Sequence, residues 1–366
     1  MRIKQIHIQN FKSLVDFKLE NLPQFCAFVG PNASGKSNIF EALEFVNLLP
    51  RYVFETANLF DGGGDFINYN YLEESINLIK PIFIDYNLAF QNGLYVSNSL
   101  IFFRKNNKIE FSGFSGGDDA RRAFEEFKNL DFTEIKNLQE REKIIEKFKN
   151  EGVIYSDEIE TFYDNFSRIF VGKTDLVRIK QSSGKLLPDA SNLSQIIGQI
   201  FQDEKKREDF IGWLPLLIPE FENIEVKKSN IDGSFEFFVY EKSSPSKPFP
   251  VRLLSDGTKN ILALMAAVYQ SNQPQFLCIE EPENGLHPQA IELLIEFFRM
   301  KCEEEGHHIW LNTHSQTLVR SLDAEEIILV NKVDGKTKAK QLTKEDSYGL
   351  KSDEAWLSNA FGGGVL

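Results

Sequence analysis

Residues 30–37 read Gly30-Pro31-Asn32-Ala33-Ser34-Gly35-Lys36-Ser37 and fit the pattern G-x-x-x-x-G-K-[ST]. The apolar run Phe25–Val29 before it predicts a buried strand, and the apolar spacing in Asn38–Leu49 predicts a helix after it. Glycines in such a loop let backbone N–H groups face a phosphate, and the helix adds its positive end. The alternative is a chance match in a glycine-containing turn, which the flanking strand and helix disfavour. The sequence therefore predicts a nucleoside triphosphate site.

The overall composition is that of an acidic globular protein. The chain has 366 residues, a formal net charge of −13 and 42% hydrophobic residues, which suits two domains or one large domain with an insertion. A protein that coats nucleic acid with its whole surface would be basic, so any DNA contact must be a local patch or belong to a partner. The apolar runs are too short to span a membrane, and three scattered cysteines do not form a disulfide framework. We therefore expect a cytoplasmic protein without membrane association.

Strands are expected on both sides of the phosphate-binding stretch. Alternating apolar residues predict two strands near Ile3–Ile8 and Phe17–Leu19. Three further strand-like runs are separated by turn-forming Asn-Gly and Asn-Asn pairs, and they predict an antiparallel meander: Pro81–Phe90, Leu94–Arg104 and Lys108–Phe114.

A helical pattern begins at Asp118. Its apolar stripe lies among charges of both signs, which favours a solvated helix face over a nucleic-acid patch. Further helices are expected in Asp157–Ile169 and Asn192–Leu217, and a hairpin is expected in 224–241. The Pro- and Ser-rich stretch Ser243–Pro250 marks the return to the first domain.

The last third of the chain alternates helices and strands. Helices are expected in Asp256–Gln270, Pro288–Glu304 and shortly after His314; strands are expected in Phe276–Glu280, His308–Asn312, Ile327–Val330 and Thr337–Leu342. We infer an α/β fold in which one nucleotide-binding domain, residues 1–115 and 251–366, is split by a mostly helical insertion, residues 116–250.

Two acidic residues lie at the end of the predicted strand Phe276–Glu280. Adjacent positions at a strand end point in different directions, so one carboxylate can serve a metal while the next faces the γ-phosphate. Phosphoryl transfer to water needs both a bound Mg²⁺ and a group that orients the attacking water. We assign Glu280 and the Ser37 hydroxyl to the metal, Glu281 to the water, and Lys36 to the β- and γ-phosphates. An acidic turn that caps the strand is the alternative.

Two other positions carry both a functional and a structural interpretation. His314 follows another apolar strand, where a neutral imidazole could hydrogen-bond the γ-phosphate; a structural histidine is the alternative. Leu254–Thr258 begins a predicted helix, where Ser255 and the following amides could bind phosphate. Ser255 could equally be an ordinary N-cap.

As an ordered set, these motifs resemble an ABC-type ATPase head of the SMC/RecF/OLD group. Gly30–Ser37 fits Walker A, Leu254–Thr258 the ABC signature, Phe276–Pro282 Walker B with its catalytic glutamate, and His314 the switch histidine. The run Glu281–Pro288 is most similar to OLD-like and related AAA/ABC ATPases of bacterial defence systems. The resemblance implies an ABC-type head with a mixed sheet and an antiparallel β-subdomain, ATP and Mg²⁺ as cofactors, and ATP hydrolysis.

The resemblance also implies a site completed in trans. Ser255 and Gly257 of one subunit would cover ATP bound to Lys36 of the other, in a head-to-tail homodimer or a higher homo-oligomer. The remaining nucleotide contacts that it implies come from Walker A and from the Asn10-Phe11-Lys12-Ser13 stretch, which is also similar to that group: Gly30, Asn32, Ala33, Ser34, Gly35, Ser37, Asn38 and Lys12.

No second catalytic centre is evident in the sequence. We therefore expect a switch whose output lies in a separate effector protein, a nuclease or toxin, in antiphage defence. A RecF-like DNA-repair ATPase that clamps DNA is the alternative, and a scaffold that binds ATP without turnover is a third interpretation.

The sequence departs from the pattern of the group at several positions. Glu280 stands where the group usually has Asp, and its longer side chain changes the reach to the metal. Asp256 and Thr258 replace the Gly and Gln that transporters favour, which disfavours a transporter. Gln91 is the candidate for the Q-loop, and the residues after His314 are too few for the Toprim nuclease of OLD enzymes.

Overall fold

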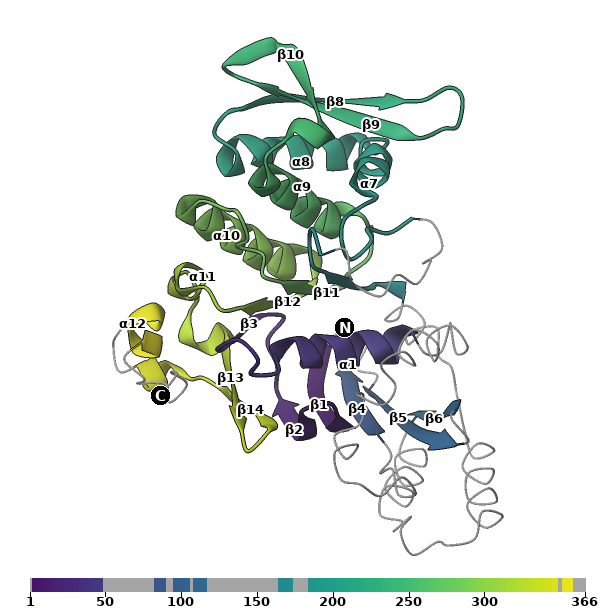
Figure 1. The fold of residues 1–366 in the computed structure, drawn as a ribbon, viewed down its shortest axis with the longest axis vertical. Coiled ribbons are helices and arrows are strands. Elements are labelled where there is room, and N and C mark those ends of the chain that lie inside the picture. The colour runs from purple at the N-terminus through teal and green to yellow at the C-terminus, as the bar shows by residue number, and fades with distance from the viewer. Residues whose placement is uncertain are drawn as a thin grey trace, which may run out of the picture.

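The computed structural model describes residues 2–48, 82–89, 95–105, 108–116, 164–173, 184–347 and 351–357. Within these ranges the chain forms three β-sheets with helices packed between and beside them (Figure 1). The sheets follow one another along the long axis of the molecule. A three-stranded sheet lies at one end, a six-stranded sheet in the middle and a five-stranded sheet at the other end.

The six-stranded sheet has the order β14-β13-β3-β12-β11-β7. Its strands are β3 (Phe25–Val29), β7 (Phe166–Ile169), β11 (Phe276–Glu280), β12 (His308–Thr313), β13 (Ile327–Val333) and β14 (Lys336–Gln341). All neighbours are parallel except β13 and β14. β3 and β11 are buried along their whole length, which explains why both are nearly continuous apolar runs. Because parallel strands end at the same edge, the loops after β3, β11 and β12 are brought together.

Both faces of this central sheet are covered by helices (Figure 1). Helix α1 (Lys36–Leu48) packs on one face, and α9 (Asp256–Tyr269) and α10 (Pro288–Glu305) pack on the other. Neighbouring residues of β3 point to opposite faces: Phe28 belongs to the core under α1, and Ala27 to the core under α9 and α10. The motifs at the N-terminal ends of α1 and α9 therefore belong to helices on opposite sides of the sheet.

The five-stranded sheet has the order β2-β1-β4-β5-β6 and is antiparallel throughout. Its strands are β1 (Arg2–Phe11), β2 (Leu14–Glu20), β4 (Ile82–Ala89), β5 (Tyr95–Lys105) and β6 (Lys108–Gly116). The predicted meander is confirmed, and it is extended by the pairing of β4 with β1. Its expected turns, Asn92-Gly93 and Asn106-Asn107, lie outside the described residues.

The three-stranded sheet and two helices form a lobe over α9 (Figure 1). The elements are α7 (Leu193–Ile200), α8 (Glu204–Leu217), β8 (Phe221–Lys228), β9 (Phe235–Glu241) and β10 (Ser244–Pro250). The predicted helical region and hairpin are confirmed. The Pro- and Ser-rich stretch contains an irregular third strand that pairs with β9, and its role as a domain boundary stays a prediction.

One expected helix is wrong at its C-terminal end. The expected helix Asp157–Ile169 includes residues 166–169, which form β7 and pair in parallel with β11. All four residues of β7 are buried, and so short a run cannot show whether its period is that of a strand or a helix. A piece of the expected insertion thus belongs to the central sheet, while residues 117–163 lie outside the described ranges.

The predicted α/β alternation of the last third is confirmed. Besides α9 and α10, it contains α11 (Gln316–Arg320) and α12 (Ser352–Leu357). Helix α10 begins with Pro288 and is followed by Gly306 in the left-handed conformation, the usual signals for a helix start and end. Among the described helices, none combines the length and the apolar character needed to cross a membrane.

Candidate nucleotide-binding and hydrolysis site

The loop between β3 and α1 is shaped by two close backbone approaches. A Cβ at Gly30 would lie 2.1 Å from the carbonyl oxygen of Val330 on β13, so only glycine fits there. Gly35 has a φ of +99°, and a Cβ there would lie 1.9 Å from Thr337 Oγ1 on β14. Ala33 is also left-handed, with a φ of +63°. Such changes of hand let successive N–H groups face one concavity, as an anion site requires.

Lys36 is buried at the first position of α1 and folds back over this loop. Its ammonium donates hydrogen bonds to the carbonyl oxygens of Gly30 at 2.8 Å and Pro31 at 2.9 Å. Burial lowers the pKa of Lys36, and the carboxylates at the end of β11, first among them Glu281, oppose that decrease. The ammonium is thus held at the loop and close to the acidic residues of the Walker B segment.

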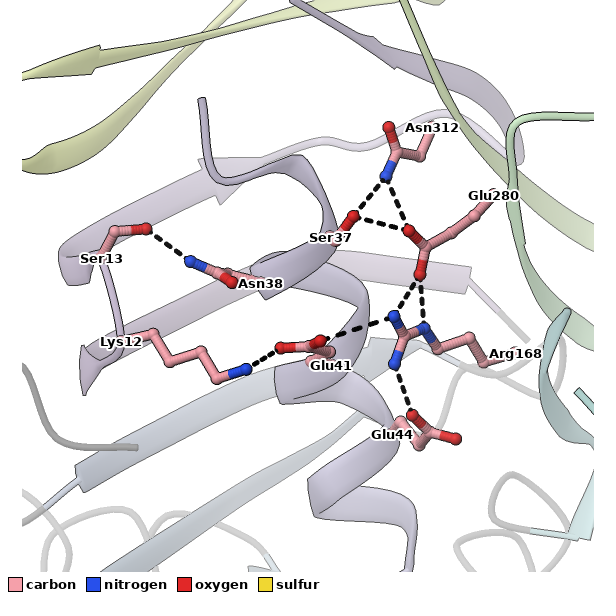
Figure 2. Close-up of polar contacts among 9 residues, drawn as sticks. All are labelled: Lys12, Ser13, Ser37, Asn38, Glu41, Glu44, Arg168, Glu280 and Asn312. Carbon is pink, nitrogen blue, oxygen red and sulfur yellow. Dashed lines mark hydrogen bonds and ion pairs between the residues drawn. The ribbon is translucent and has the colours of Figure 1, made fainter. Parts of the chain in front are cut away.

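A hydrogen-bond network supports the loop through residues distant in the sequence. Thr337 Oγ1 donates to the carbonyl oxygen of Ser34 at 3.0 Å and lies 2.6 Å from Ser13 Oγ. Asn38 Nδ2 donates to Ser13 Oγ at 2.7 Å (Figure 2). The loop is therefore fixed by both the β1–β2 turn and β14. Asn38, predicted to contact nucleotide, is part of this support.

The remaining loop residues differ in exposure. Asn32 and Ala33 are exposed at the rim, whereas Ser34 is buried. Within the described residues, Ser34 Oγ has no hydrogen-bond partner. This orphaned hydroxyl lies in the loop that the sequence assigns to phosphate.

Glu280 and Ser37 meet where β11 ends and α1 begins (Figure 2). Ser37 Oγ donates a hydrogen bond of 2.6 Å to Glu280 Oε2. Asn312, on the neighbouring strand β12, donates through Nδ2 to both oxygens at 3.2 Å each. The two residues predicted to hold a metal are thus in direct contact, and Asn312 is a third polar group that the sequence analysis did not assign.

Arg168 on β7 contacts the other oxygen of Glu280 (Figure 2). Its Nε donates to Glu280 Oε1 at 2.6 Å, and Nη2 pairs with the same oxygen. Its Nη1 donates to Glu44 Oε2 on α1 at 2.8 Å. Burial raises the pKa of Glu44, and Arg168 opposes this increase. The sequence analysis missed Arg168, although a charged residue inside a short apolar run signals a need for buried partners.

Lys12, predicted to contact nucleotide, belongs to the same ionic network. Its ammonium pairs with Glu41 Oε2 on α1, and Glu41 Oε1 lies 3.7 Å from Arg168 Nη2. Figure 2 shows the chain of contacts from Lys12 through Glu41 and Arg168 to Glu280.

Glu281 and His314 face one another at the ends of β11 and β12. His314 Nδ1 lies 3.4 Å from Glu281 Oε1, and Asn284 Nδ2 donates to Glu281 Oε2 at 3.0 Å. Glu281 has a φ of +48°, rare for a residue with a side chain, and its N–H donates to the carbonyl oxygen of Asn312. Because of this left-handed backbone, the alternation of side-chain direction along β11 ends at Glu280, and Glu281 does not continue it.

The signature segment, Leu254–Thr258, packs closely against the loop at residues 281–287 that follows Walker B. Ser255 Oγ accepts a hydrogen bond from the N–H of Thr258, so its role as an N-cap is confirmed. A Cβ at Gly257 would lie 2.4 Å from the carbonyl oxygen of Gly285. Asn260 Nδ2 donates to backbone carbonyls of that same loop. Within the described part of the chain, neither Ser255 nor Gly257 hydrogen-bonds to the Walker A loop.

Glu283, like Asn312 and Arg168, is a residue to which the sequence analysis gave no role. Thr313 Oγ1 donates to Glu283 Oε1 at 2.5 Å, and Glu283 Oε2 is buried without a hydrogen-bond partner among the described residues. Burial raises the pKa of this carboxyl. The Q-loop candidate Gln91 lies outside the described residues.

The fold and the ordered motifs define a P-loop ATPase of the ABC type. A family model described as "AAA domain, putative AbiEii toxin, Type IV TA system" matches residues 25–320, and the chain belongs to this family. The expected relationship to ABC-type ATPases of the SMC/RecF group is confirmed, as is the ATPase class.

Solved structures with the same fold include SMC heads. The SMC head of Thermotoga maritima aligns with a TM-score of 0.50 and 16% identity over 94% of this chain and 100% of that one. An SMC head bound to the C-winged helix domain of ScpA aligns with a TM-score of 0.57 and 15% identity, over 96% and 100% of the two chains. At these identities the similarity establishes the fold.

Proteins similar to this chain in sequence include a phosphatase and RecF. An "ATP/GTP phosphatase" of Helicobacter pylori is 20% identical over 94% of both chains. The "DNA replication and repair protein RecF" of Lactococcus lactis is 46% identical over 48 residues, so the matched stretch spans only 13% of either chain.

Proposed function

We propose that this ATPase is a switch that dimerises head-to-tail around ATP and Mg²⁺ and controls a separate effector in antiphage defence. The main support for an ATP-driven switch is that Walker A, Walker B and His314 lie together at one edge of the central sheet. There Ser37 contacts Glu280, and Glu281 contacts His314.

The loop suits the phosphates of ATP. Its left-handed positions orient N–H groups toward one side, and the orphaned Ser34 hydroxyl would gain a partner from a phosphate oxygen. Among the described residues, the hydrogen-bond acceptors of Lys36 are the backbone carbonyls of Gly30 and Pro31. A β- or γ-phosphate would be a stronger partner for its charge, because charge-assisted hydrogen bonds are roughly twice as strong as neutral ones.

The pair Ser37–Glu280 suits Mg²⁺. A hydroxyl and a carboxylate oxygen 2.6 Å apart are hard oxygen donors, the type that Mg²⁺ prefers. Ser37 would bind the ion directly and Glu280 through water. A bound Mg²⁺ neutralises negative charge on the β- and γ-phosphates.

Glu281 and His314 are the residues that we assign to the attacking water and the γ-phosphate. The Glu281 carboxylate would orient the water and accept its proton, and the N–H of the neighbouring His314 imidazole would donate to the γ-phosphate. Asn284 fixes the second carboxylate oxygen, which restrains the rotation of the side chain.

The separation of the signature from Walker A supports completion of the site in trans. Helices α9 and α1 cover opposite faces of the central sheet, and Ser255 is exposed at the start of α9. A second copy, turned by a two-fold axis, would bring Ser255 and Gly257 to the ATP of its partner. ATP would then close the dimer and hydrolysis would reopen it.

The family description, "putative AbiEii toxin, Type IV TA system", supports a role in a toxin system. The assignment of the output to a separate partner rests on the resemblance to switch ATPases whose effector is a different protein. The short match to RecF favours the alternative of a DNA-repair clamp.

The test uses Glu281→Gln, which should bind ATP without hydrolysing it. Tagged protein is purified from its native host in the presence of ATP, and Lys36→Ala serves as the matched variant that cannot hold the closed state. Co-purification of a stoichiometric nuclease or toxin with Glu281→Gln alone would support the proposal. A dimer bound to nucleic acid without a protein partner would favour the repair clamp. Unchanged ATP turnover in Glu281→Gln would contradict the assigned mechanism.

A further inference from the structure

We propose that Arg168 is a positioning residue for the magnesium site, where it holds one oxygen of Glu280 so that the other faces Ser37. This inference rests on the proposed magnesium site. The Arg168 guanidinium donates from Nε and Nη2 to Glu280 Oε1, which leaves Oε2 for the hydroxyl of Ser37 (Figure 2). Oxygen Oε1 of Glu280 is thus bound by Arg168, and oxygen Oε2 faces Ser37, on the side of the proposed metal.

The setting makes this division rigid. The side chains of Arg168 and Glu280 are 4% and 1% exposed, so water does not compete for their contacts. Nη1 of the same planar guanidinium is bound to Glu44 on α1. The arginine therefore ties β7 to α1 and cannot turn without breaking both contacts. A lysine, which offers one point charge, cannot reproduce this fork.

The contact also explains how glutamate can serve where the resembling group usually has aspartate. A glutamate side chain is longer by one C–C bond of about 1.5 Å and has one more rotatable bond. Without a second anchor, its carboxylate would have more orientations to lose on binding a metal. Arg168 removes that freedom. An aspartate at position 280 would be too short to contact Ser37 and Arg168 together.

The experiment measures Mn²⁺, used as the probe for Mg²⁺, by electron paramagnetic resonance with a non-hydrolysable ATP analogue present. Arg168→Lys keeps the charge and removes the fork, so it should weaken Mn²⁺ binding at least about tenfold. Binding of the analogue in EDTA should stay within about twofold of wild type, because the loop is not altered. Arg299→Lys is the matched control: it removes a comparable arginine fork, on Glu326, that contacts neither Ser37 nor Glu280, and it should bind Mn²⁺ like wild type.

A second variant keeps the test decisive if Arg168→Lys does not fold. Glu280→Asp should also weaken Mn²⁺ binding, although Asp is the usual residue of the group. In the double variant the two losses should not add, because each removes the same contact. Wild-type Mn²⁺ affinity in Arg168→Lys or in Glu280→Asp would overturn the inference. Absence of metal-dependent turnover in the wild-type protein would instead overturn the proposed function.

Discussion

His314 Nδ1 lies 3.4 Å from Glu281 Oε1, although the two residues come from loops after different strands. Their contact follows from the parallel pairing of β11 with β12, which places Glu280 beside Asn312 and carries the next residues of both strands to the same edge. The left-handed φ of Glu281 then re-aims its side chain. From this contact we predict that substitutions of the two residues have coupled effects on ATP turnover.

His314→Ala should reduce kcat by roughly 10²-fold, because one donor to the developing charge is lost. ATP affinity should change little, since the Walker A contacts remain. Adding His314→Ala to Glu281→Gln should cause little further loss, because the hydrolysis step that His314 assists already depends on Glu281. Steady-state turnover and equilibrium ATP binding measure the two effects. Independent, multiplicative losses would contradict the pairing.

Thr337→Val should destabilise the protein and weaken ATP binding. The substitution keeps the shape of the side chain but removes the hydroxyl that donates to Ser34 and contacts Ser13, at a cost of about 1–3 kcal/mol. Urea unfolding and ATP titration check this. Ser243→Ala, which removes an exposed hydroxyl in the turn between β9 and β10, is the control and should stay within about 0.5 kcal/mol of wild type.

Gly257→Ala and Gly212→Ala should have opposite effects on stability. A Cβ at Gly257 would lie 2.4 Å from the Gly285 carbonyl oxygen, so the signature must shift and ATP-dependent dimerisation should be lost. A Cβ at Gly212, in α8, meets nothing within 4 Å, so alanine there should stabilise the helix by about 0.5–1 kcal/mol. Thermal unfolding and light scattering with ATP distinguish them. A normal ATP-bound dimer in Gly257→Ala would contradict the assigned role of the signature.

Glu283→Gln should stabilise the protein at neutral pH. Burial raises the pKa of Glu283 above the ordinary glutamate value of 4.5, and the hydrogen bond from Thr313 opposes part of that increase. The folded state therefore holds the proton more tightly than the unfolded state. The stability that this group contributes is complete below pH 4.5 and is lost as the pH rises through the higher folded pKa.

The glutamine amide stays neutral and can still accept from Thr313. The stability difference between Glu283→Gln and wild type should therefore grow from pH 4 to pH 8 in urea unfolding. A pH-independent difference would show that ionisation of Glu283 does not govern its effect.

Local patterns predicted the parts of the site that lie within single motifs. The Walker A loop and the acidic end of β11 each follow a strand whose apolar run is continuous, so the position of the side chains at a sheet edge could be deduced. The N-cap role of Ser255 likewise depends only on the residues that follow it.

The partners that come from distant parts of the chain could not be predicted. Thr337 lies 324 residues from Ser13, and Arg168 lies 112 residues from Glu280, with no spacing rule that links either pair. Lys12 was assigned to nucleotide because its motif resembles a family pattern, whereas its contact with Glu41 depends on how β1 packs beside α1. Only the three-dimensional arrangement reveals these pairings.

The placement of β7 has a mechanical consequence. It is one of the two edge strands of the described central sheet and pairs with one neighbour, β11, through four residue pairs. A strand held on one side is displaced at lower cost than a strand held on both. Because β7 carries Arg168, a displacement of β7 would move the guanidinium relative to Glu280. The proposed magnesium site thus lies beside an edge strand that is held through fewer residue pairs than the opposite edge strand, β14.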